Sequence, residues 1–111
     1  MLHELPTISL ALGGKTYKLF VASSHDQKLL GLSGVNSLTS EEGMIFTYDD
    51  EKPRTFQFRE TLLPLKVYFI GSSGKVVQRS SASAGQKENI SCNLPSRWVI
   101  EVLDEDTYYA G

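Results

Sequence analysis

Apolar and polar residues alternate along most of the chain, which is the pattern of β-strands whose two faces differ. Residues 7–12 alternate larger apolar side chains with small or polar ones, Gly13 and Gly14 interrupt the pattern, and residues 15–22 resume it. Two such runs joined by glycines predict a β-hairpin. The remaining strands are predicted at residues 44–48, 54–58, 65–70, 75–79 and 97–103.

Two short helices are expected beside these strands. Ser24 followed by Gln27 at the third position is typical of a capping box at a helix start. Gly34 is expected to end this helix after about two turns. Near the end of the chain, Asp104 can cap a second helix over residues 105–109.

The predicted elements fit a single domain that spans residues 1–111, because a chain of 111 residues has room for one core. The expected fold class is mainly β: a β-sandwich or partly open barrel, jelly-roll-like, with one or two short helices. Residues 80–96 are mostly small, polar or charged. A connection of that length is expected to be either mobile or functional.

Composition and charge exclude several classes of function. Eleven Lys and Arg residues against 13 Asp and Glu residues give a formal net charge of −2, so no general basic field is available to hold a nucleic acid. The apolar runs are far shorter than a bilayer span requires. Residues 1–6 carry an acidic residue where a secretory signal is basic, and a single cysteine agrees with a reducing compartment. We therefore expect a cytoplasmic protein that binds neither nucleic acid nor membranes.

Several motif-like groups have ordinary structural explanations. Residues 13–16 read Gly-Gly-Lys-Thr, like the end of a phosphate-binding loop, but Ser9 stands where that motif needs its first glycine. His25 follows two serines, which helix capping already explains. Two distant histidines and one cysteine do not suit a zinc site, so no metal and no cofactor are expected. Cys92 has no CxxC partner and is expected to be an inert thiol in the polar loop.

The most informative polar residues lie together at a strand end, just before the bend that Pro64 favours. Gln57, Arg59, Glu60 and Thr61 are the candidate binding residues, because polar side chains at the end of a rigid strand can meet a ligand. In the plainer alternative, Arg59 and Glu60 satisfy backbone groups at the bend or form a surface ion pair.

Four blocks of the sequence, in this order, carry a family resemblance. They are residues 27–32 (QKLLGL), 38–46 (LTSEEGMIF), 56–65 (FQFRETLLPL) and 98–102 (WVIEV). Together they resemble the domain-of-unknown-function family numbered 192, also called uncharacterised protein family 0127. The resemblance implies a compact jelly-roll-like β fold with a short helix packed over it, and it implies no established reaction.

The chain departs from this family where a site would lie. The family usually has Trp-Met-Lys-Asn-Thr where residues 57–61 read Gln-Phe-Arg-Glu-Thr, and Lys66 stands where the family usually has Asp. The family pattern also usually continues past Gly111 into another strand. An uncovered edge strand is therefore expected, and it would pair with a second copy or dock on a larger assembly. The short form, without a visible signal sequence, would suit a phage- or plasmid-encoded version.

Three functional hypotheses follow. The first is a non-catalytic binding or interaction module, with an unidentified ligand or protein partner, whose contact surfaces are the bend at 59–61 and the loop at 80–96. The second is a small enzyme acting on a polar metabolite or saccharide, with Glu60 as acid or base and Arg59 as anion clamp. The third is a structural accessory protein, for example a component that decorates a viral coat.

Overall fold

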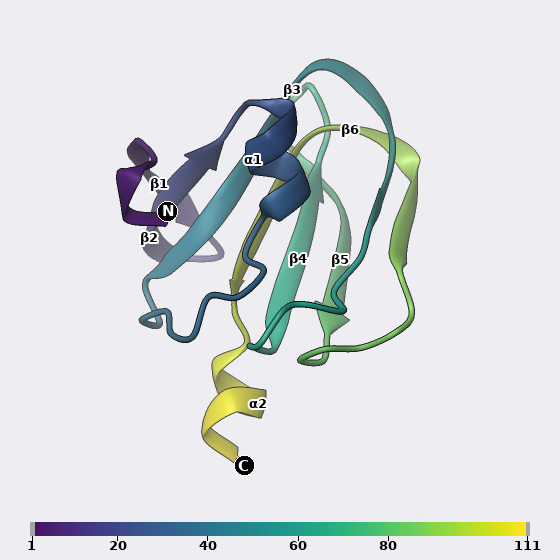
Figure 1. Ribbon diagram of the computed structural model, residues 1–111. Helices are drawn as coiled ribbons and strands as arrows, with labels where there is room; N and C mark the ends of the chain where they lie inside the picture. The colour runs from purple at the N-terminus through teal and green to yellow at the C-terminus, as the bar shows by residue number, and fades with distance from the viewer. Residues whose placement is uncertain (1, 111) are drawn as a thin grey trace.

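A six-stranded mixed sheet forms the centre of the molecule (Figure 1). The computed structural model describes residues 2–110. Neighbouring strands across the sheet follow the order β1-β2-β3-β6-β4-β5. All neighbouring pairs are antiparallel except β2 and β3, which are parallel because the chain crosses over between them through α1. The elements in chain order are η1 (Leu2–Glu4), β1 (Thr7–Leu12), β2 (Lys15–Ala22), α1 (His25–Leu30), β3 (Glu42–Phe56), β4 (Leu65–Ile70), β5 (Val76–Ala82), β6 (Ile90–Leu103) and α2 (Glu105–Ala110).

The predicted fold class is confirmed: the protein is mainly β, its sheet is open, and the described residues form two short α-helices. The second helix begins after Asp104, whose carboxylate accepts a hydrogen bond from the backbone N–H of Thr107. An open sheet has two edges, which here are β1 and β5. Association of the protein through one of these edges stays a prediction.

The prediction of two separate strands at 44–48 and 54–58 was wrong. One long strand, β3, covers both segments and pairs with β6, with irregular register between Thr47 and Arg54. Pro53 lies in the irregular part, where its missing N–H does not interrupt a regular ladder. The charged stretch that is typical of a turn in the sequence is therefore a bulged part of one continuous strand.

The long loop expected at 80–96 is also shorter than predicted. β5 extends to Ala82 and β6 begins at Ile90, so the connection covers only residues 83–89. Cys92, expected in an exposed loop, is fully buried in β6. It points inward between two exposed polar neighbours, an alternation that the small, polar composition of this segment conceals.

The capping box predicted for the first helix is confirmed. The Ser24 hydroxyl accepts a hydrogen bond from the Gln27 backbone N–H at 3.1 Å, and the Gln27 side chain accepts one from the Ser24 backbone N–H at 3.1 Å. The helix ends at Leu30 and is therefore shorter than the helix ending at Gly34 that the sequence predicts. Gly31 follows with a φ of 54°, which favours glycine. A Cβ at this position would meet the Phe46 ring at 3.3 Å, so the end of α1 lies close against β3.

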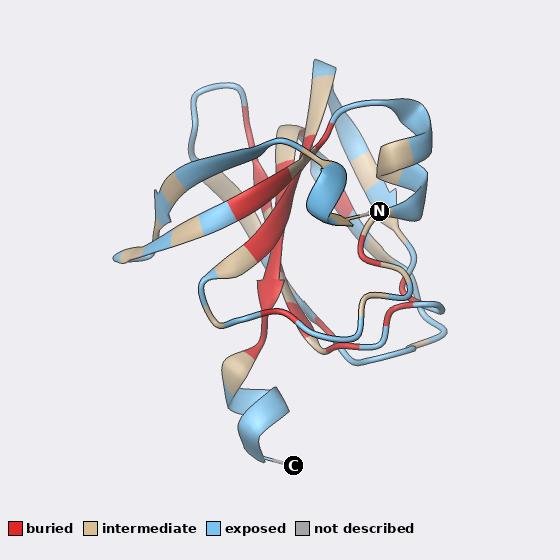
Figure 2. Ribbon diagram, turned by 60° about the vertical axis from the view of Figure 1, so that its left-hand side comes forward, coloured by how far each residue is buried: buried red, intermediate tan, exposed pale blue. Residues whose placement is uncertain are grey.

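Two apolar clusters cover the two faces of the sheet. Because strand side chains alternate, Val99 and Leu103 of β6 join the larger cluster, whereas Ile100 and Val102 join the other. Figure 2 shows the buried residues concentrated in the central strands and the exposed ones on α1 and α2. Glu101 is an exception within this pattern, because the same alternation places a charged residue on the face of the larger cluster.

Candidate ligand-binding cavity

A cavity of about 270 Å³ lies between α1, β3 and the segment that follows β3. The parallel β2–β3 connection requires the chain to cross one face of the sheet, and this crossover places α1 in front of the central strands (Figure 1). Leu32, Phe46 and Phe56 give the cavity apolar walls. The rings of Phe46 and Phe56 pack edge to face, with centroids 5.0 Å apart. The apolar walls are therefore held by the same aromatic packing that forms the core.

Glu101 lies in the inner wall of this cavity. It belongs to β6, which pairs with β3 on one side and β4 on the other, and its partners there are Met44 and Val67. The residue is only 3% exposed. Within residues 2–110, its carboxyl group has neither a hydrogen-bond partner nor an ion-pair partner. Burial alone raises the pKa of this group from 4.5 to about 8, because removal from water disfavours the charged form.

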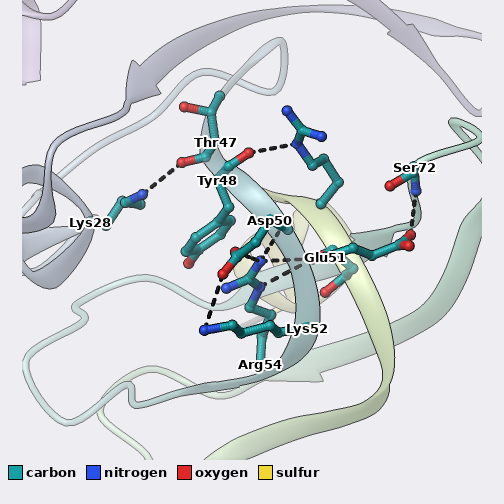
Figure 3. Close-up of polar contacts among 10 residues, drawn as sticks. Lys28, Thr47, Tyr48, Asp50, Glu51, Lys52, Arg54 and Ser72 are labelled. Carbon is teal, nitrogen blue, oxygen red and sulfur yellow. Dashed lines mark hydrogen bonds and ion pairs between the residues drawn. The ribbon is translucent and has the colours of Figure 1, made fainter.

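Tyr48 forms the neighbouring part of the wall and is held by two cations (Figure 3). The Lys28 ammonium lies 4.2 Å from the centre of the Tyr48 ring, and the Arg54 guanidinium carbon lies 3.7 Å from it. Lys28 also donates a hydrogen bond to the Thr47 carbonyl at 2.7 Å. Burial raises the pKa of Tyr48 above its ordinary value of 10; the Arg54 charge opposes this rise, and the Glu101 carboxyl adds to it. The tyrosine hydroxyl is therefore neutral at physiological pH.

Two of the four predicted binding residues line the cavity. Gln57 and Thr61 do so, and Thr61 is 6% exposed. Neither side chain forms a hydrogen bond with any other described residue. Arg59 and Glu60 are exposed and lie outside the lining. The buried ring of Phe58 anchors this segment in the core, so the turn that follows it projects Arg59 and Glu60 into solvent.

No contact among the described residues supports the alternative in which the Arg59 and Glu60 side chains satisfy backbone groups at the bend or form a surface ion pair. Across the described chain, neither side chain forms an ion pair or a side-chain hydrogen bond. The carbonyl of Glu60 does accept a hydrogen bond from the Gly34 N–H at 3.0 Å. That backbone bond ties the bend to the segment after α1, and it does not involve either charged group.

Sequence reasoning missed Glu101, although a signal was present. Val99, Glu101 and Leu103 alternate with Ile100 and Val102 in residues 97–103, the part of β6 that was predicted as a strand. Both alternating sets are apolar apart from Glu101, so either face would bury it. A charged residue inside such a strand is costly and therefore indicates a special environment.

The structure offers less support for a metal site, a membrane-spanning helix or a second ligand site. No group of three or more His, Cys, Asp or Glu side chains among residues 2–110 could hold a metal ion. Within the same residues, no helix has the length and apolar character needed to cross a bilayer. A second cavity, of about 540 Å³, lies between η1 and the segment after α1, and its titratable lining residues, His3 and Glu4, are both exposed.

Comparison with known proteins establishes the family. A family model described as "DUF192: Uncharacterized ACR" matches residues 8–108. The chain belongs to the DUF192 family. This match confirms the resemblance drawn from the four sequence blocks. No curated protein matches this DUF192 chain.

Two solved structures share the fold of this DUF192 protein. One, from Sinorhizobium meliloti 1021, is described as a "putative transcription regulator"; it is 24% identical, with a TM-score of 0.77 over 93% of this chain and 82% of that one. The other, a protein of unknown function from Novosphingobium aromaticivorans DSM 12444, is 25% identical, with a TM-score of 0.78 over 88% of this chain and 71% of that one. None of these findings supports the viral accessory role.

Proposed function

We propose that this DUF192 protein is a non-catalytic binding module that takes a small polar molecule into the cavity between α1 and β3. The observation that carries the proposal is the side chain of Glu101, which is 3% exposed, lines the cavity and has no partner elsewhere in the described chain. A buried carboxyl without hydrogen bonds lowers the stability of a protein. A bound molecule would supply the missing hydrogen bonds and recover that free energy.

The remaining lining residues support the same proposal. Gln57 and Thr61 present an amide and a hydroxyl that form no side-chain hydrogen bond within residues 2–110. Phe46 and Phe56 supply apolar surface on the walls. A few polar groups among apolar walls are the usual composition of a ligand site. A volume of about 270 Å³ limits the ligand to the size of a small metabolite.

A binding role is better supported than catalysis by Glu60 and Arg59. Both side chains are exposed and outside the cavity lining. An acid or base that works in solvent lacks the exclusion of water and the positioning partners that acid–base catalysis uses.

The test uses backbone amide NMR spectra of the whole protein with three defined probes: D-glucose, acetamide and ethanolamine. We expect at least one probe to shift the amide signals of Gly31, Thr61 and Glu101 while leaving that of Gly74, in the turn before β5, unchanged. Thr61→Val should weaken binding several-fold, because it removes one hydroxyl and keeps the shape of the side chain. Glu60→Gln is the matched control and should bind as the wild type does.

Two outcomes would contradict the proposal. One is that none of the three probes moves the cavity signals at millimolar concentrations. The other is that the shifts centre on Arg59 and Glu60 and disappear in Glu60→Gln while Thr61→Val binds normally.

A further inference from the structure

We infer that the ligand presents a primary ammonium group, which the Glu101 carboxylate binds at the inner wall of the cavity. This inference rests on the binding function proposed above and names the chemical class of its ligand. The ligand is a small amine whose carbon skeleton packs against the apolar walls.

The first step is the missing counter-charge of Glu101. The residues beside it on β3 and β4 are apolar. The other titratable groups that line the cavity are His25 and Lys28 from α1 and Tyr48 from β3. Lys28 is already engaged, because its ammonium donates to the Thr47 carbonyl at 2.7 Å and lies over the Tyr48 ring. None of the described cations pairs with Glu101, so a cationic ligand would supply the counter-charge that its carboxylate form lacks in the described chain.

The second step is the match between donors and acceptors. An ammonium group has three N–H donors and no acceptor. Glu101, Thr61 and Gln57 all line the cavity and carry oxygen acceptors, and none of these side chains is hydrogen-bonded to another residue in the described chain. A neutral hydroxyl ligand would donate one hydrogen bond, which water also offers. An ammonium adds charge neutralisation, which is worth most where solvent is excluded.

The third step is the proton balance. The pKa of Glu101 is about 8 in the free protein, so its carboxyl is mainly protonated at pH 7. A primary aliphatic ammonium, like that of a lysine side chain, is charged at the same pH. When the ammonium binds, the Glu101 O–H bond breaks, the proton leaves to solvent, and the carboxylate pairs with the ammonium. Affinity should therefore rise about tenfold per pH unit between the Glu101 midpoint in the complex and pH 8, and level off just above pH 8 while the ammonium stays charged.

The experiment follows the Glu101 carboxyl carbon by NMR in the full protein labelled with ¹³C at the glutamate side chains. Ethanolamine and ethylene glycol are the probes, because they differ chiefly in one ammonium group in place of one hydroxyl. We expect ethanolamine to lower the titration midpoint of Glu101 by more than one pH unit, as a counter-charge does. Ethylene glycol should leave the midpoint unchanged, and Glu101→Gln should lose ethanolamine binding.

The possible failures are distinguishable. If ethanolamine leaves the Glu101 midpoint unchanged, or binds Glu101→Gln as tightly as the wild type, the ammonium inference is overturned. Binding of D-glucose or acetamide in the cavity would then still uphold the binding function. If none of these compounds moves the cavity amide signals, both proposals fall. The midpoint is measured on the wild-type chain, so the test does not depend on how any variant folds.

Discussion

Two carboxyl groups on neighbouring strands experience opposite environments. Asp50, on the bulged part of β3, accepts a hydrogen bond from Arg54 at 2.8 Å and pairs with Lys52 at 3.1 Å, and these cations lower its pKa to about 2. Glu101, on β6, is buried without a partner in the described residues, and desolvation raises its pKa to about 8. Tyr48 connects the two regions, because it lies beside Glu101 in the cavity wall and under Arg54.

The difference shows that the protein pairs the exposed carboxylate of Asp50 with cations at the surface and leaves the buried carboxyl of Glu101 unpaired within the described residues. Asp50 could be replaced with little consequence, since an exposed carboxylate is hydrated whether or not it is paired. Glu101 has no such alternative, because it is buried at the cavity wall with only 3% of its surface exposed. Several cations lie within the same molecule, yet Lys28 and Arg54 bind backbone carbonyls and a tyrosine ring and leave Glu101 unpaired. A destabilising group kept beside a cavity is consistent with the binding function proposed above.

The largest effect is expected for Glu101→Gln, measured by urea unfolding at several pH values. The pKa of Glu101 is about 8 in the folded chain and near 4.5 when the chain is unfolded. The folded state therefore holds the proton more tightly. The stability from this protonation is fully present below pH 4.5, decreases by about 1.4 kcal/mol per pH unit above it, and is lost once the pH has risen through 8. Glu101→Gln lacks that loss, so it should match the wild type near pH 4.5 and exceed its stability clearly at pH 8.

Glu60→Gln provides the control, since Glu60 is exposed and should follow the wild type at every pH. A constant difference between Glu101→Gln and the wild type across the whole range would mean that Glu101 is solvated in solution. The contrast with Asp50 would then be lost, and with it the basis of the binding proposal.

Local sequence patterns predicted the positions of most helices and strands, but they did not predict where two predicted strands are continuous. The hairpin at Gly13 and Gly14, the capping box at Ser24 and residues 97–103 of the last strand all depend on residues close in sequence, so periodicity and turn chemistry suffice. The continuity of β3 through Pro53 depends on pairing with β6, more than 35 residues away. No local pattern contains that information, and the charged segment therefore resembles a turn.

The same distinction applies to the candidate site. Gln57 and Thr61 were predicted to bind a ligand because they lie at a strand end, and both line the cavity. Arg59 and Glu60 are adjacent in sequence but project outward, because Phe58 anchors the segment in the core. Glu101 joins the site only through the order of strands in the sheet. Pattern reasoning could identify it as an unusual residue, but it could not indicate which cavity it faces.

A second, smaller effect should separate Gly43, which lies against the Glu101 backbone, from Gly71, which lies against the Glu51 side chain. A Cβ at Gly43 would lie 2.3 Å from the Glu101 carbonyl oxygen and 2.8 Å from a Val102 methyl carbon, so Gly43→Ala requires backbone movement. A Cβ at Gly71 would lie 3.3 Å from the Glu51 side-chain oxygen that accepts a hydrogen bond from the Ser72 N–H, and this flexible side chain needs to shift only slightly. We expect Gly43→Ala to lose about 3 kcal/mol of unfolding free energy and Gly71→Ala less than about 1 kcal/mol. Equal losses in urea unfolding would show that the β3–β6 contact beside Glu101 is not tightly packed.

The smallest effect is expected for Asp50→Asn, which removes the paired carboxylate from the comparison. The pKa of Asp50 is lowered from 3.8 to about 2, so its pairing contributes stability above pH 3.8 and loses it as the pH falls through 2. Because Asp50 is exposed, the melting temperature of Asp50→Asn at pH 7 should fall only slightly, and the difference should shrink in high salt. Arg54 should stay in place, since it also donates to the Ser96 carbonyl and stacks on Tyr48. A large loss that salt leaves unchanged would show that Asp50 is a structural residue, and the two carboxyl groups would then no longer represent opposite uses of charge.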